Sequence, residues 1–136
     1  MSRIAVITFP GSNDDGDAAL ALEGLGADVA RVWHASPALP DDTGGVLLPG
    51  GFSYGDYLRC GAIARFAPVM QAVTDFARSG GAVLGICNGF QILCEAGLLP
   101  GVLRANRQQQ FVCADVELEV LTTRTGFTPG CVVGER

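Results

Sequence analysis

Four short runs, most of them ending in a turn or a polar connection, predict β-strands in the first ninety residues. They are Arg3–Phe9, Asp28–Trp33, Gly45–Leu48 and Ala82–Ile86. Three of the four are apolar almost throughout, which is typical of strands buried on both faces of a sheet. The second alternates between polar and apolar residues and predicts a strand with one more exposed face.

Three segments with helical spacing follow these strands. The first has three candidate N-cap residues before it and a glycine beyond its end, two common boundary signals of a helix. Its cap candidates are Ser12, Asn13 and Asp14, its apolar positions are Ala18, Leu20, Ala21, Leu22 and Leu25, and the glycine is Gly26. The second helix is predicted over Ala67–Ser79, with Pro68 in its first turn, and the third over Asn88–Ala96.

Strict alternation over Val112–Leu121 predicts one further strand, with a solvated face. Strands that alternate with helices imply an α/β fold, in which helices cover both faces of a parallel sheet. Ligands then bind at the carboxyl ends of the strands. With 136 residues, the chain suits a single domain over residues 1–136.

Composition narrows the possible chemistry. The chain has 14 Asp+Glu against 9 Lys+Arg, and all nine cations are arginines. The lack of lysine excludes Schiff-base chemistry and a Walker-type phosphate lysine, and the acidic balance argues against a nucleic-acid partner. With one histidine and five irregularly spaced cysteines, a zinc site is not expected. The unpaired thiols and the lack of a signal peptide or membrane-spanning run favour a cytoplasmic protein.

The strongest chemical signal is the stretch Gly85-Ile86-Cys87-Asn88-Gly89-Phe90-Gln91, between a predicted strand and a predicted helix. This is a cysteine form of the nucleophile elbow, a tight strand-to-helix turn that exposes the nucleophile at the sheet edge. Cys87 would lie at a helix N-terminus, which favours the thiolate, and the N–H of Asn88 would face an oxyanion. The alternative is a buried structural cysteine beside incidental glycines, which the order of strand, turn and helix disfavours.

A second signal is Pro49-Gly50-Gly51-Phe52, where the third strand ends. In a parallel sheet this loop can lie beside the elbow, so the N–H of Gly50 or Gly51 can complete an oxyanion hole. Taken alone, the loop would be an ordinary glycine turn. Together with the elbow, it favours a functional role.

Gly85-x-Cys87-x-Gly89-x-Gln91 resembles the motif of the class I (triad) glutamine amidotransferases. The run Pro49–Ala64 (PGGFSYGDYLRCGAIA) is similar to one branch of that class, the glutaminase subunits of phosphoribosylformylglycinamidine synthase. Phe9–Asn13, Asn106-Arg107 and Phe111-Val112 are also similar, so the resemblance covers nearly the whole chain. It implies a flavodoxin-like form of the α/β fold.

The resemblance also implies a mechanism. Cys87 would attack the side-chain amide of glutamine, release ammonia and form a thioester that water hydrolyses. Asn88 with Gly50 or Gly51 would hold the oxyanion, and Phe52 and Gln91 would bind the substrate. A synthetase subunit, with a small third subunit as a further partner, would use the ammonia to make formylglycinamidine ribonucleotide in purine biosynthesis. ATP and Mg²⁺ would belong to that partner, leaving no cofactor or metal in this chain.

One feature departs from the pattern of the class, whose triad is completed by a downstream His-x-Glu. The histidine here, His34, precedes Ala35-Ser36 and lies upstream of Cys87, so we interpret it as a strand-end residue without a catalytic role. We therefore expect a domain that lacks its C-terminal part and is inactive alone. Two alternatives stay open: another amidase or peptidase of the superfamily, and a catalytically incomplete domain that only binds a synthetase.

Weaker interpretations concern several other side chains. Asp56 and Arg59 can face a synthetase or form a local ion pair. Ser12 and Asn13 can bind an anion, although helix capping is the favoured role. The remaining cysteines are interpreted as small core or surface residues: Cys60, Cys94, Cys113 and Cys131.

Overall fold

The computed structural model describes residues 3–136, which divide into two compact units. The first unit ends at Leu103 and the second covers Arg104–Arg136. In the part of the chain that the model describes, every helix and strand lies in the first unit. One amidotransferase-type domain over the whole chain stays a prediction.

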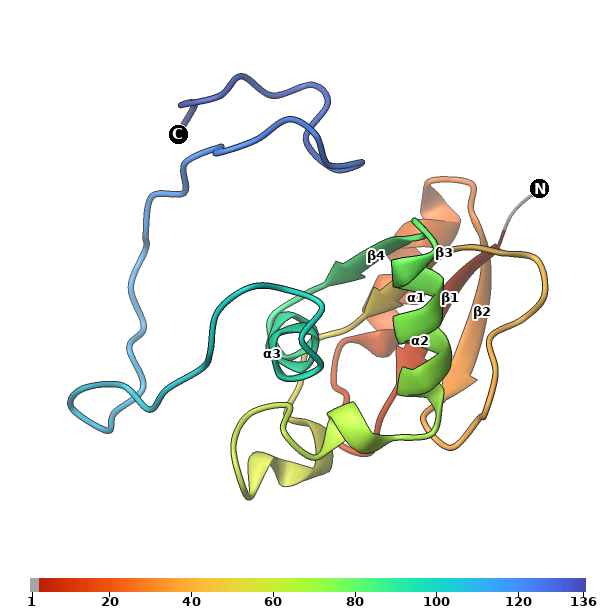
Figure 1. Ribbon diagram of the computed structural model, residues 1–136, viewed down its shortest axis with the longest axis horizontal. Coiled ribbons are helices and arrows are strands. Elements are labelled where there is room, and N and C mark those ends of the chain that lie inside the picture. Colours follow the sequence, from red (N-terminus) through yellow and green to blue (C-terminus); the bar gives the residue numbers. More distant parts are fainter. Residues whose placement is uncertain (1–2) are drawn as a thin grey trace. The chain divides into compact units, whose positions relative to one another are not determined.

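Four parallel strands form the sheet of the first unit (Figure 1). They are β1 (Arg3–Thr8), β2 (Asp28–Trp33), β3 (Thr43–Leu48) and β4 (Ala82–Gly85), in the order β2-β1-β3-β4. All four predicted strands are therefore present, with ends shifted by at most two residues. The order reverses between β1 and β3, which is the flavodoxin-like arrangement and confirms the predicted fold class.

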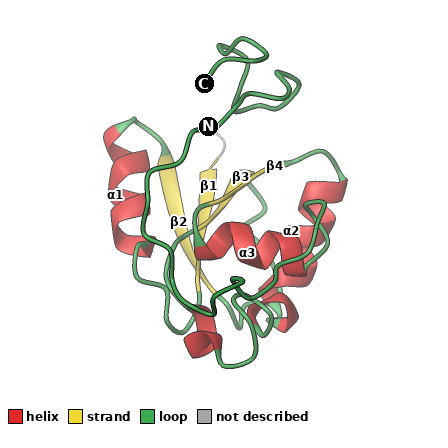
Figure 2. Cartoon of the chain, turned by 90° about the vertical axis from the view of Figure 1, so that its left-hand side faces the viewer, coloured by secondary structure: helices red, strands yellow, loops and turns green. Residues whose placement is uncertain are grey.

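Three helices cover the two faces of this sheet: α1 (Asp15–Gly24), α2 (Val69–Arg78) and α3 (Asn88–Glu95). The chain steps from β1 to β2 in one direction and from β3 to β4 in the other. Because both crossovers are right-handed, α1 and α2 lie on opposite faces. Figure 2 shows α1 on one side of the sheet and α2 and α3 on the other.

The core lies mainly between the sheet and the pair α2 and α3. Alternate residues of β1 and β3 point to this face, and Ala64 and Ala67 fill the space beside α2. The buried cluster contains Ala5, Ile7, Phe9, Val32, Val46, Leu48, Ala64, Ala67, Val69, Met70, Val73, Ile92 and Leu93. Val6 and Leu47 are buried on the opposite face, which α1 covers.

The helix boundaries correct two details of the prediction. Asp14 occupies the N-cap position of α1, but its side chain makes no capping hydrogen bond. The Ser12 hydroxyl instead accepts a hydrogen bond from the Phe9 N–H and so closes the turn after β1. Helix α2 begins at Val69 rather than Ala67, because Ala67 is extended before Pro68, as expected for a residue that precedes proline.

The apolar spacing of α1 does not correspond to a buried stripe. Leu20 and Leu25 are exposed, and Ala19 is the buried residue of this helix. Helix α1 contacts β1 and β2, and β2 is the edge strand of the sheet. These two strands offer little surface, so only a narrow part of α1 is covered.

The predicted strand over Val112–Leu121 is wrong: these residues form no strand, and nearly all of their side chains are exposed. The alternation of polar and apolar residues is compatible with a strand, but a strand also needs a neighbouring strand with which its backbone groups can form hydrogen bonds. Within Arg104–Arg136, Val120 exchanges two 2.9 Å backbone bonds with Gly134 and Glu135. These two bonds do not extend into a ladder. Among residues 3–136, none of the helices is long and apolar enough to cross a membrane.

We predict that Ile92→Ala costs about 2–5 kcal/mol of unfolding free energy, because Ile92 is fully buried between α3 and the sheet. Leu20→Ala is the control, since Leu20 is 68% exposed and its truncation should change stability by about 0.5 kcal/mol or less. Urea unfolding measures both. Equal losses in the two variants would contradict this description of the core.

Candidate active site

The carboxyl ends of β1, β3 and β4 bring three loops together. The loop after β1 contains Gly11–Asp14, the loop after β3 contains Gly50–Phe52, and Cys87 follows β4. Ser12 and Gly51 form an isolated antiparallel bridge between the first two loops. The candidate residues from the sequence therefore meet at the sheet edge where ligands bind in this type of fold.

Cys87 lies on a strained turn between β4 and α3. Its φ and ψ are 50° and −107°, a left-handed conformation that is rare for residues other than glycine. The residue is exposed and occupies the N-cap position of α3. Such strain costs about 1–3 kcal/mol and is characteristic of functional sites. This is the elbow geometry that the sequence motif predicts.

The two glycines of the motif are required by close packing. A methyl group on Gly85 would lie 2.6 Å from the carbonyl carbon of Gly89 and 2.7 Å from Leu93 Cδ1. A methyl group on Gly89 would overlap the carbonyl oxygen of Leu48. The first turn of α3 thus approaches the ends of β3 and β4 too closely for a side chain at either position.

The loop after β3 lies directly beside Cys87. A methyl group on Gly50 would be 3.6 Å from Cys87 Cβ and would overlap the Asp14 carboxylate. Gly51 has a φ of 141°, and a methyl group there would lie 2.5 Å from the Gly11 carbonyl oxygen. The Gly50 carbonyl accepts the Asn13 N–H at 3.0 Å, and the Phe52 N–H donates to the Gly11 carbonyl at 3.0 Å. Among the turn, loop and cap hydrogen bonds of residues 3–136, the backbone N–H groups of Gly50, Gly51 and Asn88 donate to no backbone carbonyl.

The side chains of Asn88, Gln91 and Phe52 take different positions at this edge. Asn88 is buried, and its amide nitrogen donates to Gln91 Oε1 at 2.9 Å. Gln91 is half-buried. Its side chain lies beside the elbow, where its oxygen already accepts the hydrogen bond from Asn88. Phe52 is exposed next to the glycine loop, where a bound substrate could cover it.

The structure adds a turn, Ser53–Asp56, to which the sequence analysis gave no catalytic function. Tyr54, Gly55 and Asp56 all have positive φ, at 54°, 73° and 52°. Asp56 Oδ1 accepts hydrogen bonds from Asn88 Nδ2 at 3.4 Å and from the Gly61 N–H at 3.3 Å. The sequence signal was the resemblance of Pro49–Ala64 as a block, which identified no role for Asp56 toward Asn88.

His34 lies at the end of β2, as predicted. Its Nδ1 shares a hydrogen bond with the Tyr54 hydroxyl, and burial lowers its pKa while burial raises the pKa of Tyr54. In the order β2-β1-β3-β4, the ends of β2 and β4 are three inter-strand spacings apart, about 14 Å. His34 is therefore too far from Cys87 for direct proton transfer.

The thiols differ in their surroundings. Burial, followed by the carboxylate of Asp56 and the charge of Cys87, raises the pKa of Cys60. Burial and the neighbouring Glu95 raise the pKa of Cys94. Cys113, in the second unit, is exposed like Cys87. Among residues 3–136, no group of three or more His, Cys, Asp or Glu side chains is arranged to hold a metal ion.

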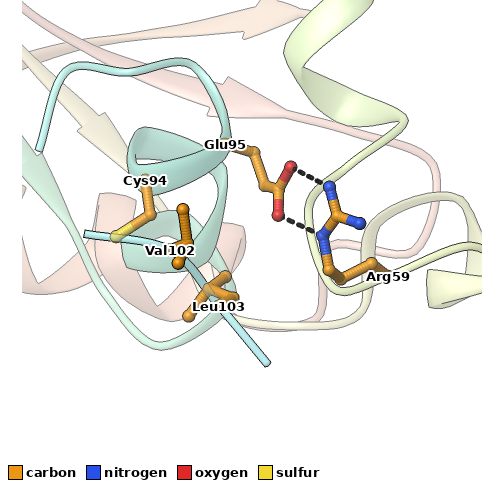
Figure 3. A pocket seen from close by; sticks show the side chains of 5 residues that line it. All are labelled: Arg59, Cys94, Glu95, Val102 and Leu103. Carbon is orange, nitrogen blue, oxygen red and sulfur yellow. Dashed lines mark hydrogen bonds and ion pairs between the residues drawn. The ribbon is translucent and has the colours of Figure 1, made fainter. Parts of the chain in front are cut away.

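A cavity of about 260 Å³ lies away from Cys87, at the C-terminal end of α3 (Figure 3). Arg59, Cys94, Glu95, Val102 and Leu103 line it. Arg59 binds the Glu95 carboxylate through both Nε (2.5 Å) and Nη2 (2.8 Å). Arg59 therefore forms a local ion pair with Glu95, whereas Asp56, which the sequence analysis considered together with Arg59, bonds to Asn88 and Gly61 instead. The ion pair connects the loop after the turn to α3.

The fold and the strained elbow define an α/β protein with an exposed cysteine on a strand–turn–helix motif. The family model of the CobB/CobQ-like glutamine amidotransferase domain matches residues 1–125, and the chain belongs to this family.

Named relatives agree with this assignment. The chain is 58% identical over 134 residues to the phosphoribosylformylglycinamidine synthase subunit PurQ of Bradyrhizobium diazoefficiens. It is 59% identical over 134 residues to the subunit of the same name from Rhodopseudomonas palustris (strain ATCC BAA-98 / CGA009). Each match covers 98% of this chain and 58% of the relative's length.

A solved structure is also similar. One chain of the structure of PurLQS from Thermotoga maritima superimposes with a TM-score of 0.87 at 43% sequence identity. The match covers 98% of this chain and 62% of that chain. The chain thus spans somewhat less than two thirds of the proteins that it resembles.

We predict that a glutamine-like chloroketone labels Cys87 in preference to the other thiols. Cys60 and Cys94 have raised pKa values and so contain less thiolate at neutral pH, whereas Cys87 is exposed at a helix N-terminus. Peptide mapping identifies the labelled thiol, and exposed Cys113 reports non-specific reaction. Labelling of Cys60 or Cys94 with Cys87 spared would contradict the assignment.

We predict that Glu95→Gln lowers the melting temperature at pH 7. The hydrogen bond from Arg59 holds the pKa of Glu95 below its ordinary value of 4.5, so the ionised carboxylate stabilises the fold above that pH. This contribution is lost as the pH falls through the lower pKa of the folded state, so the difference from wild type should shrink below pH about 4. Melting curves from pH 3 to 7 test this, with exposed Glu23→Gln as the control. A difference independent of pH would contradict it.

Proposed function

We propose that this protein is the glutaminase component of a phosphoribosylformylglycinamidine synthase and that it acts through a Cys87 thioester. The observation that carries the proposal is the left-handed, exposed Cys87 with Gly50 against its Cβ. An exposed thiol beside a loop with candidate backbone N–H donors supports acyl transfer, which requires a nucleophile and an oxyanion hole close together. The names of the two relatives support the choice of reaction.

In this proposal the Cys87 thiolate attacks the side-chain carbonyl carbon of glutamine. A carbon–sulfur bond forms, and the carbonyl electron pair moves to an oxyanion held by the N–H of Asn88 and of Gly50 or Gly51. When the intermediate collapses, the carbon–nitrogen bond breaks and the nitrogen leaves as ammonia after gaining a proton. Water then attacks the thioester, which releases glutamate and restores the thiol.

The remaining residues would bind the substrate. Phe52 is exposed beside the glycine loop and can cover the aliphatic part of glutamine, while Gln91 lies one turn into α3 from Cys87.

Ammonia released here would pass to a synthetase subunit, which would use ATP and Mg²⁺ to form the amidine in purine biosynthesis. A small third subunit belongs to the same proposal. The similarity to a chain of PurLQS supports an assembly of this kind. Five free cysteines support a reducing, cytoplasmic location.

A second candidate function is a domain that binds a synthetase without turning glutamine over. One observation favours it: the single histidine of the sequence is three strands away from Cys87. The two candidates differ in the fate of the thioester, which experiment can follow.

We predict that Gly50→Val slows thioester formation by roughly 10²–10³-fold, because its side chain would displace the loop N–H from the oxyanion, an effect comparable to the loss of one oxyanion donor. The new side chain would lie against Cys87 Cβ, while its other close neighbour, the Asp14 carboxylate, can move. The melting temperature should therefore change little. The matched variant Gly51→Ala should melt lower, because the φ of 141° and the Gly11 carbonyl at 2.5 Å do not accommodate a methyl group. Normal acylation in Gly50→Val would show that this loop is only a turn.

We predict that the 136-residue chain alone acylates Cys87 slowly and once, and does not release glutamate at a steady rate. Efficient protonation of the leaving nitrogen needs a general acid and activation of water needs a general base, and His34 is too distant to act as either. Glutamate release should appear once a component that supplies a His-Gly-Glu is present. The assay compares the chain alone, the chain with a synthetase, and a chain extended through such a motif, each with a Cys87→Ala control. Steady glutamate release by the chain alone would contradict the proposal that turnover depends on a His-Gly-Glu.

A further inference from the structure

We propose that the Asn88 side chain is a positioning residue for the glutamine site, and this inference rests on the proposed function. Its carboxamide joins the Cys87 elbow to the Ser53–Asp56 turn and so sets the position of the Gly51–Phe52 segment. This role is separate from that of its backbone N–H.

The first support is the way in which the Asn88 side chain is bonded. It is 2% exposed, and each of its polar atoms has a partner. Oδ1 accepts the backbone N–H of Ser53 at 3.0 Å, and Nδ2 donates to Gln91 Oε1 at 2.9 Å and to Asp56 Oδ1 at 3.4 Å. A buried amide with two donor contacts and one acceptor contact requires two acceptors and one donor around it, because a partner of the wrong type would be left unpaired.

The second support is strain in the turn that Asn88 holds. Three consecutive residues with positive φ persist only where surrounding contacts determine them. Outside the turn, these contacts include the Tyr54 N–H to the Pro10 carbonyl at 2.7 Å, the Tyr54 hydroxyl to His34, the Gly61 N–H to Asp56 Oδ1 at 3.3 Å, and the Asn88 bonds. Of these, the Asn88 bonds come from the elbow.

The third support is how Asp56 extends this connection. The oxygen that meets Asn88 also accepts the N–H of Gly61. Gly61 packs on the backbone of α3, since a methyl group there would lie 2.7 Å from the Ile92 nitrogen. The turn is thus held against both the first and the second turn of α3. The glycine loop and the turn adjoin in sequence, so a shift of the turn moves the candidate oxyanion donors.

The test is the rate at which Cys87 reacts with two reagents in the full chain. A glutamine-like chloroketone reports glutamine-site geometry, and iodoacetamide reports the thiol alone. In Asn88→Asp, a carboxylate oxygen faces Asp56 Oδ1 and Gln91 Oε1. We expect chloroketone labelling to fall about 10- to 100-fold, as for a displacement of about 1 Å, with a weaker saturation constant. Iodoacetamide labelling should change less than about three-fold.

The reciprocal variant Asn88→Asp with Asp56→Asn restores a donor opposite an acceptor between positions 88 and 56 and keeps the same number of charges, and Gln91 can turn its amide so that Nε2 faces the new carboxylate. The Gly61 N–H loses its acceptor in this variant, so part of the chloroketone rate should return, which a loss of general stability would not explain. Asp56→Ala, at a half-buried position, should fold even if Asn88→Asp does not. It should lose about 5- to 25-fold, because the carboxylate accepts two ordinary hydrogen bonds. Asn106→Asp, an exposed asparagine bonded to the Gln110 carbonyl, is the matched control and should behave as wild type.

The outcomes separate this inference from the proposed function. If wild type shows no saturable, glutamine-protected labelling of Cys87, the proposed function fails. If wild type is labelled in that way but Asp56→Ala and the foldable Asn88 variants match it, the positioning role is overturned. Equal losses toward both reagents, or no recovery in the reciprocal variant, would also overturn it.

Discussion

The close approach between the first turn of α3 and the end of β3 determines most of the site. Gly89 lies against the Leu48 carbonyl, and Gly85 lies against Gly89, so neither position has room for a side chain. The Ile86 N–H closes this junction with a 3.0 Å bond to the same Leu48 oxygen. Between the two glycines the chain must reverse within one residue, and Cys87 takes the left-handed conformation that results. The same junction brings Gly50 beside Cys87, because Gly50 follows β3 by two residues.

A polar connection then extends this junction outward. The Ser53–Asp56 turn contains two non-glycine residues with positive φ, a strain of about 1–3 kcal/mol each. Contacts from four sources offset it: the loop after β1, His34 at the end of β2, the Gly61 N–H, and the Asn88 amide. His34 therefore has a clear structural role, which explains its position without any part in proton transfer. The single imidazole of the chain supports the turn rather than the nucleophile.

Chemically, the first unit combines a candidate nucleophile and candidate oxyanion donors at one edge, with a separate cavity at the far end of α3. Arg59, which pairs with Glu95 of α3 beside that cavity, belongs to the same run, Pro49–Ala64, as the strained turn. This run thus packs along α3 from its first turn to its last. Its similarity to one branch of the amidotransferases reflects a continuous structural element, in which the turn, the loop and the ion pair depend on the same helix.

The sequence by itself determined the four strands, their alternation with helices, and the strand–turn–helix at Cys87. These features follow from local patterns: apolar runs of strand length, and glycines where the backbone reverses. Three things depended on the tertiary structure. Leu20 and Leu25 are exposed because the neighbouring strands, not the helical spacing, decide which face of α1 is covered. Val112–Leu121 forms no strand because alternation supplies no hydrogen-bonding partner. The roles of Asn88, Asp56 and Tyr54 arise from contacts between residues 20 to 35 positions apart, which only the folded chain brings together.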